Sequence, residues 1–216
     1  EFRDSDKAKL LSELGDQIWG QASSADPSAS LESLNPFLLI TFADLKKYRY
    51  YYWCGFPAVA WKPGWEIFEE WKTVELGGVP EAHEAVYLTR PAFSPEATVE
   101  TGPLASFASF WANTPAEERG VVFNDPSSHA TAPGWPLRNA LLYLFAAPSS
   151  LSPPLSSLRI TLVRDGSAIS NVVRVKQGEP TPAPGARFAT VGWEKNEKGK
   201  LGPRMADLGP LMDPTR

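Results

Sequence analysis

The sequence predicts an α+β fold, in which a mixed β-sheet has flanking helices and leads into an irregular, Pro-rich C-terminal tail. Segments that favour strands alternate with segments of helical periodicity. From Gly178 onward prolines cluster and periodic segments become rare. The 216 residues are 43% hydrophobic, which is enough to bury a core. We therefore expect a globular body over residues 1–177 and an extended tail over residues 178–216.

The first segment with helical periodicity runs from Ser5 to Gly20. Ser5 is the expected N-cap, Gly20 the expected end, and Leu11, Leu14 and Ile18 share one face. Residues 21–35 are rich in Ser, Ala, Asp and Pro, which predicts a surface loop with weak helical content.

Residues Pro36 to Phe42 are apolar on both alternating faces, which predicts a central strand covered on both sides. Strand-favouring residues resume from Tyr48 to Cys54, so the two segments should form a hairpin. Pro57 and Pro63 should end its regular pairing, with residues 58–61 extending the strand only beyond a bulge.

The middle of the chain alternates strands with helices, an order that suggests parallel pairing through crossovers. Gly64 to Val79 fits a helix or an edge strand equally well, and Asp165-Gly166 predicts a turn. The remaining predicted elements are a helical patch near Pro80 to Ala85, strands Val86–Arg90, Gly120–Asn124, Leu158–Arg164 and Asn171–Lys176, and helices from Pro103 and over Pro136–Ala146.

Composition narrows the class of partner. A formal charge of -4 and a pI near 5.3 provide no basic field for nucleic acid or anionic lipid. The longest apolar runs fall far short of the roughly 20 residues of a membrane-spanning helix, and the acidic N-terminus is unlike a signal peptide. We expect a protein partner, no nucleic acid, no membrane insertion and a cytosolic setting.

Residues for catalysis or metal binding are sparse. Cys54 is the single cysteine of the chain, so an internal disulfide is excluded, and we expect its side chain to pack in the core. The two histidines, His83 and His129, are too few for a zinc site of the usual kind. The chain has no glycine-rich nucleotide-binding motif. Gly77-Gly78 and Gly185 lack the spacing of such a motif and are expected to lie in turns. Ser127-Ser128-His129 lacks a nucleophile elbow, and the carboxylate pairs Glu69-Glu70 and Glu117-Glu118 fit solvated faces. We expect no catalytic, cofactor-binding or metal-binding residues in this chain.

The most unusual local feature is the aromatic stretch from Tyr48 to Trp53. In a strand, Arg49, Tyr51 and Trp53 face one way, and the intervening tyrosines face the other. A half-exposed surface of aromatic residues and arginine is typical of protein-binding hot spots, so Arg49, Tyr51 and Trp53 are the candidate partner-binding residues. The alternative is a sheet covered on both faces, which would bury both rows.

Three blocks resemble one known family. They are residues 37–53 (FLLITFADLKKYRYYYW), residues 133–139 (PGWPLRN), and residues 191–204 (VGWEKNEKGKLGPR) with Met212-Asp213-Pro214. Together they resemble the N-terminal domain of autophagy's ubiquitin-like-activating enzymes, the autophagy-related protein seven family. The opening residues 2–7 and Ile18-Trp19 also fit, so the resemblance runs in order from end to end.

This resemblance implies a non-catalytic docking domain that recruits the autophagy conjugating enzymes of the lipid-conjugation and protein-conjugation branches. ATP, Mg, the catalytic cysteine, the modifiers and homodimerisation would belong to the parent enzyme's C-terminal domain, absent here together with much of the first lobe. The family works in the cytoplasm, including the pre-autophagosomal structure. The alternative implied role is a structural domain that orients the adenylation domain, with partner binding mainly in the missing lobe.

Overall fold

The computed structural model describes residues 2–62, 64–75, 79, 84–92, 99–147, 151–175 and 188–212. Several predicted features lie wholly or largely outside this part of the chain: Pro63, Gly77-Gly78, the patch near Pro80 to Ala85 with His83, and the prolines and Gly185 of the expected tail. The boundary at residue 177 falls outside it as well and stays a prediction.

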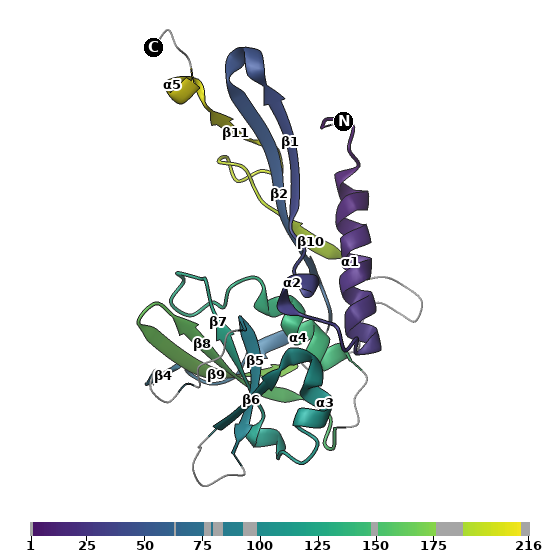
Figure 1. The fold of residues 1–216 in the computed structure, drawn as a ribbon, viewed down its shortest axis with the longest axis vertical. Coiled ribbons are helices and arrows are strands. Elements are labelled where there is room, and N and C mark those ends of the chain that lie inside the picture. The colour runs from purple at the N-terminus through teal and green to yellow at the C-terminus, as the bar shows by residue number, and fades with distance from the viewer. Residues whose placement is uncertain are drawn as a thin grey trace.

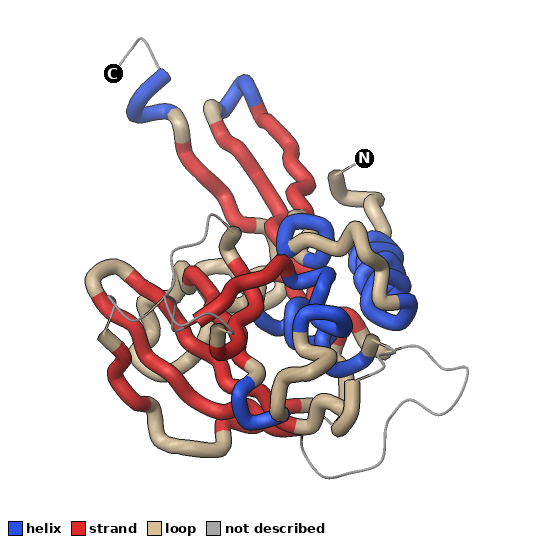
Figure 2. Tube along the Cα trace, turned by 60° about the horizontal axis from the view of Figure 1, so that its bottom comes forward, coloured by secondary structure: helices blue, strands red, loops and turns tan. Residues whose placement is uncertain are grey.

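The α+β class is confirmed, and its strands form two sheets (Figures 1 and 2). The smaller sheet, which we call the arm, has the order β1-β2-β10, with β11 also paired to β2. Its strands are β1 Leu38–Asp44, β2 Arg49–Val59, β10 Thr190–Trp193 and β11 Arg204–Asp207. In Figure 1 the arm projects from the larger sheet, which we call the body, with helix α1 alongside it.

The body is a mixed seven-stranded sheet of order β3-β9-β8-β7-β5-β6, with β4 also paired to β9. Its strands are β3 Trp65–Ile67, β4 Lys72–Val74, β5 Val86–Pro91, β6 Val99–Pro103, β7 Gly120–Asn124, β8 Ser157–Arg164 and β9 Ser167–Val175. The helices are α1 Lys7–Ser24, α2 Leu31–Leu34, α3 Phe107–Phe110, α4 Leu137–Ala146 and α5 Gly209–Met212, with 3-10 turns at Leu45–Lys47, Leu104–Ser106 and Ala116–Glu118. No described helix combines the length and the apolar character needed to cross a membrane.

Helix α1 begins one residue later than predicted and ends later as well. Asp6 is the N-cap, because its carboxylate accepts a hydrogen bond from the Lys9 amide at 2.9 Å. The helix continues past Gly20 to Ser24, where left-handed Ala25 ends it and donates its N–H to carbonyls of the last turn. The expected 21–35 loop is shorter than predicted, because residues 21–24 belong to α1 and residues 31–34 form α2, which begins at a Ser30–Ser33 capping box.

The predicted hairpin forms, but its first strand is neither central nor buried. Strand β1 pairs only with β2 among the described strands, from Leu38 opposite Gly55 to Asp44 opposite Arg49. Leu39 is 53% exposed and Phe42 is 48% exposed, so the prediction of a strand covered on both faces is wrong. The apolar pattern reflects side chains that stay partly exposed on both faces of the arm rather than burial in the core.

The predicted interruption of regular pairing at Pro57 is confirmed, and β2 continues beyond it to Val59. The register between β2 and β10 shifts at this point, because Phe56 and Pro57 of β2 lie opposite the single residue Gly192 of β10. Gly192 stands at this shift with φ +146°, and a Cβ there would lie 2.1 Å from the Phe56 carbonyl oxygen. The bulge at Phe56 and Pro57 therefore requires glycine opposite it, where β2 runs from the arm into the body.

Strand pairing in the body confirms one crossover and corrects another. Strands β7 and β8 are parallel, with α4 between them, and Asp165-Gly166 turns β8 into β9 as predicted. Strands β5 and β7 are antiparallel, because the unpredicted strand β6 pairs with β5 and reverses the chain direction before the helix. The segment left open, Gly64 to Val79, contributes edge strands β3 and β4.

The joint between arm and body centres on buried Asn139 of α4. Its side-chain amide donates to the Leu34 carbonyl at 2.7 Å and the Pro57 carbonyl at 2.8 Å, and its oxygen accepts from the Val59 amide at 3.4 Å. The Trp135 indole N–H also donates to the Phe56 carbonyl at 2.6 Å. The block at residues 133–139 thus fixes the lower end of β2 to the body.

The C-terminal part of the chain is more regular than the predicted tail. Residues 188–212 supply β10, β11 and α5, and β11 pairs with β2 from Arg204 opposite Tyr52 to Asp207 opposite Arg49. The arm is therefore a sheet made from the two distant ends of the chain.

Candidate functional site

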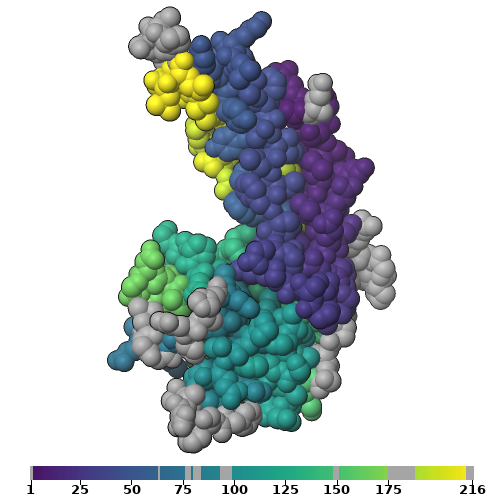
Figure 3. All heavy atoms as spheres, viewed as in Figure 1, coloured from purple at the N-terminus to yellow at the C-terminus, as the bar shows by residue number. Residues whose placement is uncertain are grey.

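The main hollow of the arm is a groove of about 910 Å³ between the N-terminal segment and one face of the β1–β2 hairpin. Figure 3 shows the purple N-terminal residues and α1 lying along the blue hairpin. The groove is lined by Phe2, Arg3, Asp4, Lys7, Thr41, Phe42, Asp44, Lys47, Tyr51, Trp53 and Pro203.

Antiparallel register builds the aromatic floor of this groove. Phe42 lies directly opposite Tyr51, with ring centroids 6.3 Å apart. The Phe2 ring lies 6.0 Å from the Phe42 ring, so the N-terminal segment extends the same aromatic surface. Because β1 is open, this surface stays partly exposed and available to a ligand.

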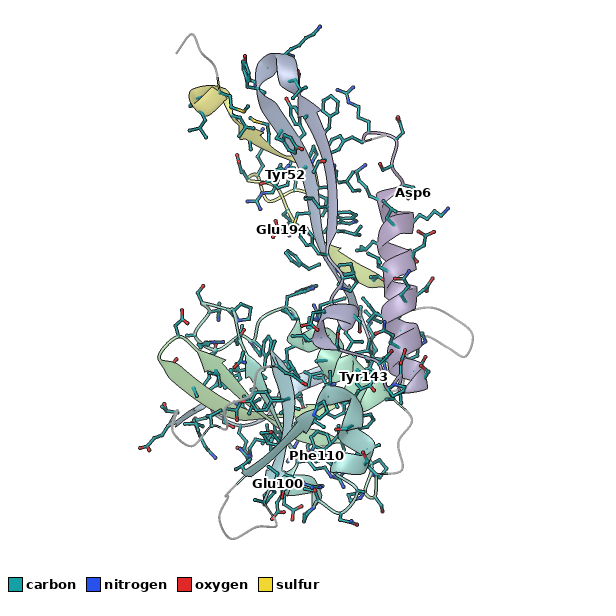
Figure 4. The ribbon with its side chains drawn as sticks, viewed as in Figure 1. Asp6, Tyr52, Glu100, Phe110, Tyr143 and Glu194 are labelled. Carbon is teal, nitrogen blue, oxygen red and sulfur yellow. The ribbon has the colours of Figure 1, made fainter. Side chains whose placement is uncertain are left out.

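Lys7, the first residue of α1, lines the groove and directly follows the N-cap Asp6, which Figure 4 labels. Its ammonium lies 5.2 Å from the Trp53 ring centroid and donates to the carbonyls of Phe2 and Ser5, each at 3.1 Å. Trp193 packs edge-on against Trp53 at 5.7 Å and donates its indole N–H to the Lys7 carbonyl at 3.2 Å. These contacts fix the helix, the N-terminal segment and β2 to one another.

A second hollow of about 330 Å³ adjoins the groove, since Lys7 and Trp53 line both. Its remaining lining is Ala8, Leu11, Ser12, Thr190, Trp193 and Leu201. The two hollows follow α1 and have mostly apolar walls, which suits an apolar side-chain row of a bound segment.

Charged side chains stand around the apolar floor. Arg3, Lys7 and Lys47 line the groove together with Asp4 and Asp44, and Lys47 pairs with Asp44 at 3.8 Å. Mixed charges around an aromatic centre are the usual composition of a protein-binding surface.

The structure separates the three predicted partner-binding residues. Tyr51 and Trp53 line the groove, half-buried. Arg49 is exposed, does not line the groove, and stands between Asp44 and Asp207 on the neighbouring strands. Their role in partner binding remains a prediction.

The opposite row of the hairpin is also partly open. Tyr50 is 40% exposed, and Tyr52 lies on the side where Glu194 pairs with Arg204 at 2.7 Å (Figure 4). The alternative that both aromatic rows are buried in a covered sheet is therefore wrong.

Sequence reasoning missed Phe2, Lys7 and Phe42 as groove residues. The hairpin itself carried a signal for Phe42, because a short turn sets the register that places it opposite Tyr51. No local signal places Phe2 or Lys7 there, since α1 reaches the hairpin through tertiary packing.

The side chains considered for catalysis are held in structural roles. His129 Nδ1 accepts backbone N–H groups of Thr131 and Ala132, and the Ser127 hydroxyl donates to the Ala132 carbonyl. Cys54 is half-buried on β2 and lies outside the hydrophobic core, so the expectation that it packs in the core is wrong. Desolvation, with the nearby Glu194 carboxylate, raises the pKa of its thiol. Within the described ranges no cluster of three or more His, Cys, Asp or Glu residues could hold a metal ion.

Comparison with known proteins places the chain in a family. The family model described as "Ubiquitin-like modifier-activating enzyme ATG7 N-terminus" matches residues 1–212. The Cryptococcus neoformans ubiquitin-like modifier-activating enzyme ATG7 (strain B-3501A) is 39% identical over 225 residues, covering all of this chain and 32% of that protein. The Homo sapiens ATG7 is 32% identical over 237 residues, covering all of this chain and 33% of that protein. The chain thus spans about a third of the length of these relatives.

Two solved structures share the fold. The Kluyveromyces marxianus Atg7NTD–Atg10 complex matches with a TM-score of 0.68 and 21% identity, covering 97% of this chain and 70% of that one. The Kluyveromyces marxianus Atg7NTD alone matches with a TM-score of 0.65 and 19% identity, covering 96% of this chain and 68% of that one.

Proposed function

Because this chain belongs to the ATG7 N-terminal family, we propose that it is a docking domain that recruits autophagy conjugating enzymes. The observation that carries the proposal is the groove on the open hairpin, whose aromatic floor is partly exposed while its walls are held rigid by Lys7 and Trp193. Rigid, partly exposed aromatic residues are typical anchors in protein interfaces.

The partner class is supported by the structural neighbour solved in complex with Atg10. We propose an Atg10-like conjugating enzyme of the protein-conjugation branch as one ligand, and the conjugating enzyme of the lipid-conjugation branch as another. Each would present a flexible segment or an exposed strand to the groove.

Docking of this kind acts by proximity. A conjugating enzyme held on the domain has a raised local concentration near the parent enzyme's thioester, so transfer becomes effectively intramolecular. This role requires a rigid and specific binding surface, and it needs no reactive side chain on the domain itself.

Further properties belong to the proposed parent protein, of which this chain would be a part. We propose that it activates ubiquitin-like modifiers with ATP and Mg in a C-terminal adenylation domain. It would form a homodimer through that domain and act in the cytoplasm, including the pre-autophagosomal structure.

The proposal is tested by calorimetric titration of the 216-residue chain with the Atg10 of the same organism. Tyr51→Ala removes one aromatic ring from the floor of the groove, whereas Tyr50→Ala removes the ring of a neighbouring tyrosine on the opposite face of the hairpin. If the groove binds the partner, Tyr51→Ala should weaken binding by about tenfold or more, as expected for an interface anchor, and Tyr50→Ala should have little effect.

Each outcome distinguishes the alternatives. Equal losses from both variants, or a larger loss from Tyr50→Ala, would place the partner elsewhere on the arm. No binding by the unchanged chain, together with binding by a longer ATG7 fragment, would favour a structural domain that orients the adenylation domain.

A further inference from the structure

Arg138, on the first turn of α4, differs from the other buried and half-buried arginines of the described chain. Arg90 and Arg204 pair with carboxylates at 2.8 Å and 2.7 Å, Arg164 pairs with Asp125 at 2.8 Å, and Arg119 donates to three carbonyls. The Arg138 guanidinium has no hydrogen-bond or ion-pair partner among the described residues.

Arg138 is nevertheless held in place. Its guanidinium stacks 4.5 Å from the Trp135 ring centroid, and Trp135 is itself fixed by its hydrogen bond to the Phe56 carbonyl. Burial lowers the pKa of the Arg138 guanidinium, which nevertheless stays charged at neutral pH. A fixed, half-buried guanidinium whose donors are not used within the protein is well placed to bind an anion that a ligand supplies.

A pocket of about 150 Å³ opens beside Arg138, between α4 and the edge strand β3. Its lining is mostly apolar and consists of Trp65, Glu66, Ile67, Pro133, Gly134, Leu137, Arg138, Leu141, Ile160 and Val173. A cavity near this size has room for a group as large as benzene, which is about one apolar side chain.

A second donor without an acceptor lies on a residue that lines the same pocket. Trp65 lines it, and the indole N–H of Trp65 is buried without a hydrogen-bond partner in the described structure. Most buried donors in folded proteins have an acceptor. The unpaired Arg138 guanidinium beside a small apolar pocket indicates a ligand that carries an oxygen acceptor next to an apolar group.

We propose that this pocket binds the C-terminal residue of a peptide, with its apolar side chain between α4 and β3 and its carboxylate on Arg138. In a C-terminal residue the carboxylate and the side chain leave the same Cα, which matches an apolar pocket that an unpaired arginine lines. The planar fork of arginine binds a carboxylate through two parallel hydrogen bonds. This site lies in the body, apart from the groove of the arm.

Glu66 is the carboxylate within the lining of the pocket, and it forms no ion pair with Arg138. Its negative charge opposes an incoming carboxylate. Its removal should therefore strengthen binding, whereas removal of the exposed Glu70 carboxylate, which does not line the pocket, should not.

N-acetyl-leucine, titrated into the ¹⁵N-labelled 216-residue chain, is the simplest probe. We expect saturable shifts of the Trp65 and Trp135 indole N–H signals, with N-acetyl-leucinamide and inorganic phosphate each binding about tenfold more weakly, since they lack either the charge or the apolar group. Arg138→Gln should abolish the shifts. Glu66→Gln should tighten binding severalfold, and Glu70→Gln should match the unchanged chain.

Equal shifts with the amide, stronger binding of phosphate, or unchanged shifts in Arg138→Gln would each overturn the proposal. The spectrum of Arg138→Gln also reports whether that variant is folded. If Arg138→Gln is unfolded, the comparison of Glu66→Gln with Glu70→Gln tests the proposed site. Equal affinities of these two variants for N-acetyl-leucine would also overturn the proposal.

Discussion

At the scale of single residues, the blocks that stand out in the sequence are explained by a few fixed contacts. Asn139 joins α4 to β2 and to the end of α2 through hydrogen bonds made by one buried amide. Trp193 joins β10 to α1, and Gly192 permits the close approach of β10 to β2. These residues are structural supports of the groove, and none of them lies on its aromatic floor.

Replacement of Asn139 by alanine should destabilise the whole chain. It would leave the Leu34 and Pro57 carbonyls and the Val59 amide without their partner in a buried place, a loss of about 2–3 kcal/mol of unfolding free energy. Thermal unfolding should show a Tm lower by about 5–10 °C.

Asn113→Ala is the matched control, since Asn113 is exposed, and its Tm should stay within about 1–2 °C of the unchanged chain. A similar Tm for both variants would contradict a structural role of the Asn139 amide.

At the scale of elements, local sequence patterns predict the positions of strands and helices better than they predict which strands pair with one another. Strand β7 and the β8–β9 turn were predicted within their observed bounds, and the hairpin of β1 and β2 was found from its aromatic residues. The pairing partners of the strands are harder to predict. The direction of β5 relative to β7, for example, depends on β6, a short strand of weak periodicity. The interruption at Pro57 could be predicted locally, because β2 carries one extra residue there relative to β10.

The packing of α1 on the arm should depend on Gly15. A Cβ at this position would lie 1.8 Å from Thr190 Oγ1 and 2.8 Å from Thr190 Cβ, so Gly15→Ala must move α1 away from β10. We expect a loss of about 1–3 kcal/mol in denaturant unfolding, together with weaker binding of the groove's partner.

Gly20→Ala provides the control on the same helix, where an added Cβ meets nothing within 4 Å. That change should raise stability by up to about 1 kcal/mol, because alanine favours helix more than glycine does. Should Gly15→Ala be stabilising as well, the close contact between α1 and β10 would be refuted.

At the scale of the whole molecule, a two-sheet architecture separates the candidate binding surface from the core. Buried side chains gather in the body around α4, β7 and β8, and the arm keeps half-exposed aromatic rows on a strand pair that is open at β1. A docking surface built this way can change its exposed residues while the core that supports it stays intact.

Hydrogen exchange should report this division. Backbone amides of β8 lie between β7 and β9, whereas β1 pairs on one side only, so peptides covering β1 should exchange about tenfold faster or more. Mass spectrometry of the native chain provides the measurement, and equal protection of β1 and β8 would contradict an open edge. On addition of the groove's partner, protection should rise in β1 and β2 and remain unchanged in β8.

The sequence by itself determined the class of fold, most strand and helix positions, the family and the aromatic row that contains Tyr51 and Trp53. These rest on periodicity, turn chemistry and local blocks, which are properties of neighbouring residues. Only the tertiary structure decided that β1 is an open edge, that β10 and β11 complete the arm, and that Phe2 and Lys7 complete the groove. Those features join residues more than 30 positions apart, so they depend on which surfaces pack together, and no local pattern encodes that choice.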